Sequence, residues 1–557
     1  MKIRKLAAAC LLICAALAAQ APKKVYPKRW FYVSRPLRSD RDLDQIRDLI
    51  RTAAAHGLNG MVYAGGLDRI DIQPPEFLER LKQMKAECDR AGIEIIPTGF
   101  NVGYGGALLA HDRNLAEGLP VKGALFVARK GEARFQSDAP PKLANGSFET
   151  HKGDAATGYT SQDAPGKLTF IDTQVAHSGK ASLRFENFGT NPEGASRIEQ
   201  SIAVRPYRSY RVRAWIRTEG AEPATLFSIR AYTPDKKRNY SWFEPELKAT
   251  AGWHEVTAGF NSWGADRLTL SIGVEEGKSG KLWLDDVRIE EVGLVDVVRR
   301  EGTPVRVRGE KNGTVYEEGR DYAPISDPKL SFRFDHESPA IRLAPGSRIR
   351  EGERLRVDYY HGATIYRDQT PACMSEPKVM EIWSRQFPLI EKYLAPKTYL
   401  LALDEVRMGG TCEACRRHNI SMAERLGQYA TKLHGMIRKG NPAAEIFVWS
   451  DMFDPNHNAH GDYYLVDGDY TGSWNYLPKD MQIACWYFER RDKSLEHFSK
   501  LGLNTLAAAY YDADDLSNPQ GWLESLDQTP GAVGIMYTTW YGKYKLLAPF
   551  GDLVNRR

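Results

Sequence analysis

Residues 399–415 read YLLALDEVRMGGTCEAC, an apolar run that ends in two adjacent carboxylates, Asp404 and Glu405, and continues into glycines. The apolar part has the length and composition of a buried β-strand, and the glycines after it indicate a loop. Acidic residues at the point where a strand enters a loop are typical of the reactive edge of a parallel sheet. The stretch therefore predicts a parallel sheet around it.

Helices and strands alternate on both sides of this stretch. Between residues 29 and 107 the runs RWFYVSR, GMVYAGG and IEIIPTGF are separated by segments with apolar residues at helical spacing. From residue 360 onward TYLLALDE, EIFVWSD, MQIACWYF, NTLAAAYYD and GAVGIMYTTW continue the pattern. Three strands before and five after predict an α/β fold, a (β/α)8 TIM barrel. A doubly wound open sheet is the alternative, although no glycine-rich dinucleotide motif supports it.

The alternation is interrupted between residues 132 and 359. Short alternating strands with turn signals, such as SYRVRAWIRT and KLWLDDVRI, take over and are typical of a β-sandwich. We therefore expect the barrel to be interrupted after strand 3. The expected division is 1–18 signal peptide, 22–131 barrel strands 1–3, 132–292 β-sandwich, 293–359 small β segment and 360–557 barrel strands 4–8.

The first residues have the pattern of a secretory signal. Three basic residues precede a short apolar run that ends near Ala19, and cleavage after Ala18 fits the small residues there. The chain is thus expected in the periplasm or outside the cell, with a lipoprotein attached through Cys10 as the alternative. No later run is long and apolar enough to predict an integral membrane span.

The net charge and the number of cysteines restrict the expected class of protein further. Removing the three basic residues of the signal from the formal net charge of +5 leaves +2, which gives no electrostatic reason to expect nucleic acid. Five cysteines remain, an odd number. The motif Cys412-x-x-Cys415, together with His418, is compatible with a zinc site. A single CxxC in an exported protein favours a disulfide instead, with Cys373 as a candidate partner.

Polar and aromatic residues gather where the predicted strands end. In a barrel these positions share one face, so the side chains are expected around one pocket. Aromatic rings stack on the C–H faces of a sugar, while carboxylates and arginine bind its hydroxyls. The positions are Arg35, Tyr63, Asn101, Asp404, Glu405, Trp449, Asp451, Trp486, Tyr510, Asp512, Tyr537 and Trp540.

The orientation of Glu405 is the critical point. Adjacent strand residues point to opposite sides, so Asp404 and Glu405 can share a pocket only if the regular strand stops at about Asp404. Gly409 and Gly410 nearby supply the freedom for such a turn. The alternative is that Glu405 pairs with Arg407 or caps a helix.

Residues 372–415, with a helix before a strand that ends in Asp-Glu, resemble the β-N-acetylhexosaminidases of glycoside hydrolase family 20. Arg35 matches that family's sugar-binding arginine, Tyr510 and Asp512 match its Tyr-x-Asp, and Trp449, Trp486 and Trp540 match its pocket tryptophans. The chain departs from the family in two places. Residues 400–403 read LLAL where the family has His-x-Gly-Gly, and Trp540 is followed by Tyr-Gly rather than x-Glu.

The resemblance implies a substrate-assisted retaining hydrolysis. The 2-acetamido oxygen of the sugar would attack C1, Asp404 would orient that amide, and Glu405 would give a proton to the leaving oxygen. Tyr510 would hydrogen-bond the acetamido group. Glu405 would then have to hold a proton at neutral pH, with the adjacent carboxylate and aromatic walls favouring this.

The β-sandwich expected at residues 132–292 resembles a different group of proteins. NGSFE at residues 145–149 and GKLWLDDVRI at 280–289 resemble the ends of jelly-roll carbohydrate-binding modules, whose first and last strands meet around a structural calcium. This implies Glu149 and Asp286 as calcium ligands. A second metal candidate is the loop after strand 5, with Asp451, Asp454, His457 and His460, for which a sugar-binding or structural role is favoured.

Taken together, the patterns predict an exported glycoside hydrolase, exo-acting on N-acetylhexosamine-containing glycans without a catalytic cofactor. Two alternatives remain open. One is a glycosidase of the same barrel type with a different sugar specificity. The other is a non-catalytic glycan-binding protein that keeps the aromatic pocket.

Overall fold

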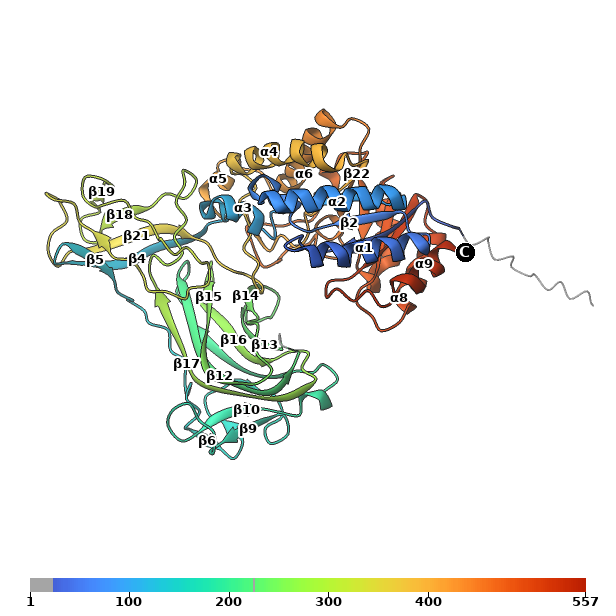
Figure 1. Ribbon diagram of the computed structural model, residues 1–557. Helices are drawn as coiled ribbons and strands as arrows, with labels where there is room; N and C mark the ends of the chain where they lie inside the picture. The colour runs from blue at the N-terminus through green and yellow to red at the C-terminus, as the bar shows by residue number, and fades with distance from the viewer. Residues whose placement is uncertain (1–23, 224–225, 557) are drawn as a thin grey trace, which may run out of the picture.

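The computed structural model describes residues 24–223 and 226–556. The predicted signal peptide, residues 1–18, lies outside the described residues. Figure 1 shows three parts: a barrel with surrounding helices, a β-sandwich below it, and a further sheet to one side. In sequence, the two antiparallel parts lie between β3 and β22 of the barrel.

Eight parallel strands form a closed barrel, in which the last strand pairs with the first. In order they are β1 (Lys28–Val33), β2 (Gly60–Tyr63), β3 (Glu94–Gly99), β22 (Thr398–Leu401), β24 (Glu445–Trp449), β26 (Gln482–Cys485), β27 (Thr505–Tyr510) and β28 (Ala532–Thr538). The predicted combination of a parallel barrel with antiparallel sheets is confirmed. The open doubly wound sheet is wrong, because β28 closes onto β1.

Strand side chains alternate between two apolar layers. Trp30 and Tyr32 of β1 pack inside the barrel with residues of the same parity from the other strands. Phe31 and Val33 point outward and pack against the helices. A strand buried on both faces reads as a continuous apolar run, which is why these strands are readable from the sequence.

Helices cover the outside of the barrel (Figure 1). They are α1 (Asp40–Ala55), α2 (Pro75–Ala91), α4 (Pro377–Leu394), α6 (Met422–Gly440), α7 (Arg491–Lys500), α8 (Ser517–Asp527) and α9 (Leu547–Asn555), and the short α3 (Gly106–His111) and α5 (Glu413–Arg416) lie at the barrel end toward the six-stranded sheet (Figure 1). The described chain between β24 and β26 departs from the regular pattern. It forms the 3-10 turns η4 (Asp451–Phe453) and η5 (Ser473–Tyr476) in place of an α-helix, so a long loop remains at the barrel end.

The β-sandwich consists of two five-stranded antiparallel sheets around one apolar core. One sheet has the order β15-β12-β17-β10-β9 and the other β14-β13-β16-β11-β8. The strands are β8 (Ser161–Gln162), β9 (Thr169–Asp172), β10 (Ser182–Phe185), β11 (Ser196–Ala203), β12 (Ser209–Glu222), β13 (Phe227–Tyr232), β14 (Asn239–Phe243), β15 (Ala251–Asn261), β16 (Arg267–Val274) and β17 (Ser279–Val292). Alternation of apolar residues produces this pattern, because each sheet buries one face.

A six-stranded sheet forms the third part, with the order β19-β18-β21-β4-β5-β20. Its strands are β4 (Leu119–Arg129), β5 (Glu132–Phe135), β18 (Arg306–Gly309), β19 (Val315–Tyr316), β20 (Ile341–Arg342) and β21 (Arg354–His361). The sequence pattern predicts residues 119–131 as part of the barrel, and the structure pairs them with β21 instead. Their partners in β21 lie more than 200 residues away, so no local pattern marks that pairing, although β4 also pairs with the adjacent β5.

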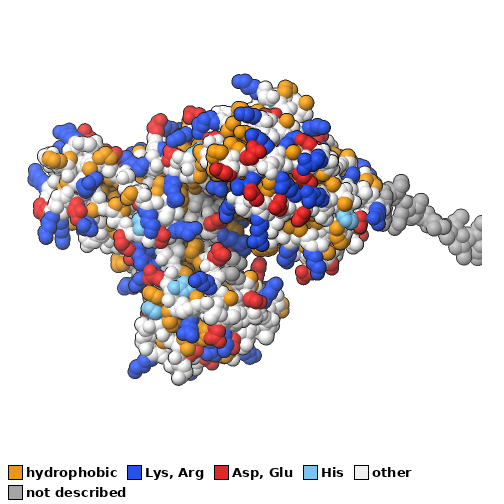
Figure 2. Space-filling model, in the orientation of Figure 1, with side chains coloured by type: hydrophobic (Ala, Val, Ile, Leu, Met, Phe, Trp, Pro, Cys, Tyr) orange, Lys and Arg blue, Asp and Glu red, His pale blue; other side chains and the backbone are white. Residues whose placement is uncertain are grey.

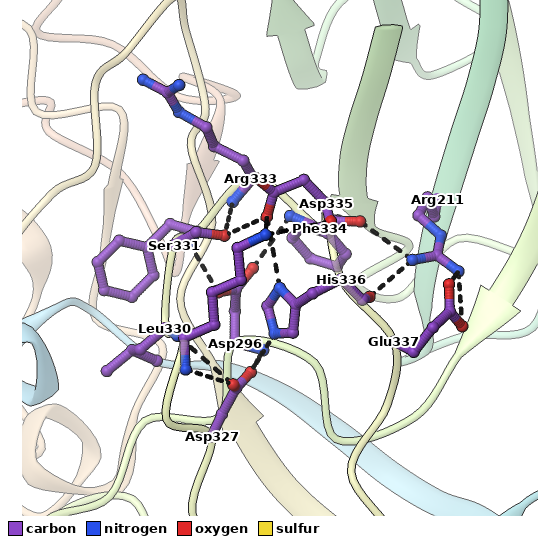
Figure 3. A network of polar contacts seen from close by, with 12 residues as sticks. Arg211, Asp296, Asp327, Leu330, Ser331, Arg333, Phe334, Asp335, His336 and Glu337 are labelled. Carbon is purple, nitrogen blue, oxygen red and sulfur yellow. Dashed lines mark hydrogen bonds and ion pairs between the residues drawn. The ribbon is translucent and has the colours of Figure 1, made fainter. Parts of the chain in front are cut away.

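A buried polar network joins this sheet to the sandwich (Figure 3). Asp296 accepts hydrogen bonds from the backbone N–H groups of Phe332 (2.7 Å) and Phe334 (3.1 Å). Arg211, on β12, donates to the carbonyl oxygens of Phe334 (3.2 Å) and His336 (2.7 Å). The segment around Phe334 is thereby held from both sides, although it lacks regular secondary structure.

The distribution of surface charge and the length and polarity of the helices relate to the expected partners. On the face drawn in Figure 2, acidic and basic side chains are intermixed over all three parts. Within the described residues, every helix is too short or too polar to traverse a lipid bilayer.

We expect Asp296→Ala to lower the free energy of unfolding by about 2–4 kcal/mol, because two buried N–H groups lose their acceptor. Chemical denaturation followed by tryptophan fluorescence measures this. Asp335→Ala is the matched control, since Asp335 lies in the same segment with an exposed side chain. Equal stability of the two variants would contradict the role of Asp296.

Candidate active site

A cavity of about 680 Å³ opens at the barrel end where the strands run into their following loops. Residues from the ends of β1, β22 and β24 line it, together with residues of the loops beyond them. Four carboxylates reach its lining, from Glu276, Asp404, Glu405 and Asp512. Eight aromatic residues complete the walls: Tyr32, Tyr104, Tyr366, Trp449, Trp486, Tyr511, Trp540 and Tyr541.

Asp404 and Glu405 both line this cavity, by different routes. Strand β22 ends at Leu401, but the alternation continues beyond it: Ala402 faces the barrel interior and Leu403 faces the helices. Asp404 has the interior parity. Glu405 would point outward in a regular strand, but its φ of +49° places it in the left-handed region and redirects it. The acidic pair therefore shares one cavity because of a single backbone conformation.

Hydrogen bonds hold Glu405 in this conformation, which costs a non-glycine residue about 1–2 kcal/mol. The backbone N–H of Glu405 donates to Oδ2 of Asp451 (2.8 Å), and its carbonyl accepts from Nε2 of Gln369 (2.7 Å). The same Asp451 oxygen accepts from Nδ2 of Asn458 (2.9 Å). Such strain persists only where the surroundings enforce it, and here both backbone groups of the residue are engaged.

The carboxylate of Glu405 has two protein partners. The hydroxyl of Tyr104 donates to one oxygen, and Nη2 of Arg407 lies 2.9 Å from the other. Arg407 is buried, with its guanidinium over the ring of Tyr366 (4.3 Å) and its Nη1 donating to Gln369 (2.6 Å). Glu405 thus lines the cavity and also pairs with Arg407, two arrangements that the sequence pattern presents as alternatives.

Asp404 lies in the opposite electrostatic environment. Burial, with the nearby carboxylates of Asp451 and Glu405, raises the pKa of Asp404 well above its usual range. An amide N–H of Asn101 donates to Oδ1 of Asp404 at 3.3 Å. Burial also raises the pKa of Asp451 to about 7. The site therefore combines a carboxylate paired with arginine and two carboxyl groups whose pKa values are raised.

The aromatic walls are arranged as flat and edge surfaces around the acidic pair. Trp486 and Tyr511 stack with an interplanar angle of 6° and centroids 6.0 Å apart. The ring centroid of Trp540 lies 5.3 Å from that of Tyr32 and 6.1 Å from that of Trp449. Trp540 and Tyr511 remain 41% and 43% exposed, which leaves ring faces free for a ligand.

The structure brings some predicted residues to the cavity and leaves others outside its lining. Trp449, Trp486, Trp540, Asp404, Glu405 and Asp512 line it. Asp451 lies behind it, as the acceptor for Glu405. Asp512 also has a structural task, because it accepts from the backbone N–H of Trp540 (2.7 Å) and so fixes the loop that carries this ring.

Tyr510 and Tyr537 are corrected by the structure. They stack on each other (4.1 Å, 14°) in the layer between barrel and helices. Tyr510 has a φ of +81°, which breaks the alternation of β27, and Tyr511 lines the cavity in its place. A one-residue change of this kind follows from backbone conformation, which the motif Tyr-x-Asp does not encode.

Arg35 is the third correction. Its guanidinium lies 3.6 Å from Asp42 at the start of α1, and it does not belong to the cavity lining, where Tyr32 and Ser34 represent β1 and the loop after it. The arginine that does line the cavity is Arg367, which pairs with Glu244 (2.6 Å). Arg367 follows β21, and Glu244 follows β14 of the sandwich, so only the tertiary structure could bring them together.

Sequence reasoning also missed Tyr104, Gln369 and Glu276. Tyr104 follows the third strand, so its strand-end position was a usable signal. Gln369 lies on the return to the barrel, and Glu276 lies between β16 and β17 of the sandwich. Neither position had a local signal, because Glu276 reaches the cavity lining from the sandwich and Gln369 acts through its bonds to Arg407 and the carbonyl of Glu405.

Glu149 and Asp286, the predicted calcium ligands, lie at the same segment of the sandwich. Glu149 accepts from the backbone N–H groups of Lys180 (2.8 Å) and Ala181 (3.2 Å). Asp286 bonds Nδ1 of His177 (2.6 Å) and the hydroxyl of Ser178 (2.9 Å). Both bonds of Glu149 end on Oε1, whereas both oxygens of Asp286 are engaged. Calcium takes six to eight oxygen ligands, and the calcium site stays a prediction.

No protein-family model matches this sequence, and a search of curated proteins finds no match. Among solved structures, a chitobiase of Flavobacterium johnsoniae from glycoside hydrolase family 20 aligns over 95% of this chain and 48% of its own, with 9% identity and a TM-score of 0.36. A family 16 carbohydrate-binding module aligns over 26% of this chain and 97% of its own (15% identity, TM-score 0.20). A CBM4 structure aligns over 27% and 99% (14% identity, TM-score 0.20). Similarity at this level does not establish membership of a family.

Asp451→Asn should alter the pH dependence of stability. An acid whose pKa is raised from about 4 in the unfolded chain to about 7 in the folded one binds more protons when folded, so stability falls as pH rises through that window. Denaturation between pH 4 and 8 should show the wild type losing free energy of unfolding relative to Asp451→Asn. Parallel curves for the two proteins would refute the raised pKa.

Proposed function

We propose that this chain is a glycoside hydrolase whose catalytic pair is Asp404 and Glu405. The observation that carries the proposal is that both residues line one aromatic-walled cavity at the strand-end mouth of a closed barrel. Barrel enzymes place their chemistry at this end, and glycoside hydrolysis uses two carboxyl groups. Flat aromatic faces suit the C–H surfaces of a sugar ring.

We propose N-acetylhexosamine-containing glycans as substrates, cleaved from an end. Glu276 of the sandwich and Tyr541 of the last barrel loop both reach the cavity lining, which narrows the space available to a continuing chain. Trp486, Tyr511 and Trp540 offer rings to a bound sugar, and the amide of Asn101 offers a polar contact beside Asp404. A pocket of about 680 Å³ lies within the range of ordinary small-molecule sites.

The charges in the free site support a division of labour opposite to the one implied by the family resemblance. Asp404 favours its protonated form because of burial and neighbouring carboxylates, so it is the better proton donor at neutral pH. Glu405 is instead engaged by two donors, the hydroxyl of Tyr104 and the guanidinium of Arg407. We therefore assign the proton donor to Asp404 and the amide-orienting carboxylate to Glu405.

In the proposed reaction the acetamido oxygen attacks C1 as the bond from C1 to the leaving oxygen breaks. Asp404 transfers its proton to that oxygen, and Glu405 accepts the acetamido N–H, which increases the electron density on the attacking oxygen. A water molecule then opens the cyclic intermediate while Asp404 takes up a proton. The configuration at C1 is retained, and no carboxylate becomes attached to the sugar.

Assigning the proton donor to Asp404 or to Glu405 predicts a different dependence of each variant's activity on the leaving group. We expect Asp404→Asn to lose about 10²–10⁴-fold in kcat/KM on a 4-methylumbelliferyl N-acetylglucosaminide, the usual contribution of general acid catalysis. Most of this loss should disappear on a 2,4-dinitrophenyl glycoside, whose leaving group needs no proton. Glu405→Gln should be impaired on both substrates. Rescue of Glu405→Gln rather than Asp404→Asn would restore the roles implied by the resemblance.

Gly103→Ala tests the position of the pair without touching a carboxylate. A Cβ at Gly103 would lie 2.5 Å from the carbonyl oxygen of Asp404, so the backbone of the acidic pair must shift. We expect a loss of about 10-fold or more in kcat/KM, since small displacements of catalytic groups are costly. Gly106→Ala is the control, because no atom lies within 4 Å of its Cβ position. Equal activity of both variants would contradict the proposed geometry.

A non-catalytic glycan-binding protein is the second candidate. The ion pair between Arg407 and Glu405 favours it, because that carboxylate is committed to a cation in the free site. Such a protein would bind N-acetylglucosamine oligosaccharides in calorimetry and hydrolyse none of the aryl glycosides. A glycosidase of different sugar specificity would instead hydrolyse aryl glycosides lacking the acetamido group.

We also propose that the chain is exported, on the basis of its amino-terminal sequence, and that catalysis needs no cofactor. The proposed steps use only carboxyl groups, a substrate amide and water.

A further inference from the structure

Three cysteines from distant parts of the chain converge on one buried point. Cys412 and Cys415 flank the start of α5, and Cys373 lies on the return from the six-stranded sheet to the barrel. The sulfur of Cys373 is 3.6 Å from those of both Cys412 and Cys415. All three side chains are buried and unbridged.

The spacing of the sulfur atoms discriminates between two kinds of site. A disulfide bond requires about 2.05 Å between its sulfurs. In a tetrahedral site with Zn–S bonds of about 2.3 Å, neighbouring sulfurs lie about 3.8 Å apart. The observed 3.6 Å matches the edge of such a tetrahedron, and it does so for two pairs that share Cys373.

Glu117 occupies the fourth corner. Its carboxyl oxygen Oε1 accepts from the backbone N–H of Thr411 (2.9 Å), the hydroxyl of Thr411 (2.8 Å) and the backbone N–H of Cys412 (3.0 Å). Oε2 faces the sulfur of Cys415 at 3.7 Å. The three donors orient the carboxylate and leave Oε2 directed at the sulfurs, as outer partners of metal ligands do. The four ligand atoms lie within 4.8 Å of one another.

A buried arginine balances the charge of this cluster. Nη2 of Arg300 donates to the sulfur of Cys412 (3.4 Å), and its Nη1 donates to the carbonyl oxygens of Asn114 and Ala116 (both 2.7 Å). A divalent cation with three thiolates and one carboxylate carries a net charge of −2, and the positive charge of Arg300 beside it is shared with Glu376 (3.2 Å). Three thiolates and a carboxylate this close and this deeply buried would repel one another, so the anionic forms of these groups require a cation among them.

We infer that Cys373, Cys412, Cys415 and Glu117 form a structural site for a thiolate-binding divalent cation of the zinc class. Thiolate ligands select zinc over magnesium or calcium, and four protein ligands leave no open position for catalysis. The disulfide favoured by the sequence is replaced by this site, and His418 is not among its ligands.

The site lies where three segments of the chain meet. Glu117 lies where the chain leaves the barrel for β4, and Cys373 lies where it returns. The two crossings run side by side, with Ala116 bridged to Ala372. The cation would tie both to α5, which lies beside α3 at the barrel end facing the six-stranded sheet (Figure 1). Helix α5 ends the loop that begins with Asp404 and Glu405, so the cation would fix the far end of that loop.

A second group of possible ligands, Asp296, Asp327 and His336, is satisfied differently. In Figure 3 these side chains bond protein groups: Oδ2 of Asp327 bonds His336 (2.6 Å) and accepts from the backbone N–H of Asp296 (2.6 Å). Both oxygens of Asp296 accept backbone N–H groups. Backbone N–H groups and His336 thus satisfy the oxygens of this network, which gives no reason to place a cation there.

The test measures metal in the full, untagged chain, purified without chelators. Elemental mass spectrometry should find about one zinc per chain in the wild type and in Cys88→Ala, whose cysteine is buried elsewhere in α2. Cys415→Ser and Glu117→Gln should reduce this content, with near-complete loss for Cys415→Ser. Cobalt(II) exchanged into the wild type should give the visible bands of a tetrahedral site and the near-ultraviolet band of thiolate-to-cobalt charge transfer.

Two results would overturn the inference. One is a wild-type chain without zinc that also gives no thiolate-to-cobalt band. The other is a disulfide between any two of the three cysteines, detected by alkylation and mass spectrometry without reduction. If Cys415→Ser fails to fold, the wild-type cobalt spectrum and thiol count decide alone, and neither depends on enzymatic activity.

Discussion

The hydrogen bond from the backbone N–H of Glu405 to the carboxyl group of Asp451 is the contact on which the candidate site depends. It holds Glu405 in a left-handed conformation that its side chain disfavours, and this conformation turns the second carboxylate into the cavity. Without it, regular alternation would send Glu405 toward the helices, where Leu401 and Leu403 pack. A buried acid one strand away thus determines whether the site has one carboxylate or two.

The same contact connects the backbone to the electrostatics. Asp451, Asp404 and Glu405 lie close together, and all three cannot be charged at low cost in a buried setting. Arg407 and Tyr104 both contact the carboxylate of Glu405, while the pKa values of Asp404 and Asp451 are raised. Gln369 contributes twice, because it bonds both Arg407 and the carbonyl of Glu405.

The loop that starts at the acidic pair ends in the cysteine cluster, so one segment spans both features. Residues 404–415 face the cavity at one end and the exits toward the antiparallel sheets at the other. The inserted parts consequently contact the barrel end twice. The sandwich supplies Glu276 and Glu244 near the cavity, and Arg300, which follows the sandwich in the chain, supplies the counter-charge at the cluster.

The amino-acid sequence by itself determined the parallel barrel and the antiparallel sheets, because strands buried on both faces and strands buried on one face leave different periodicities. It also predicted that Asp404, Glu405, Trp449, Trp486 and Trp540 lie around one pocket, since the strand ends of a barrel share one face. Only the tertiary structure decided that Tyr511 replaces Tyr510, that Arg35 pairs with Asp42, and that Glu117 meets three cysteines. The physical reason is that periodicity records which face a residue buries, whereas left-handed backbone turns and contacts across hundreds of residues leave no local pattern.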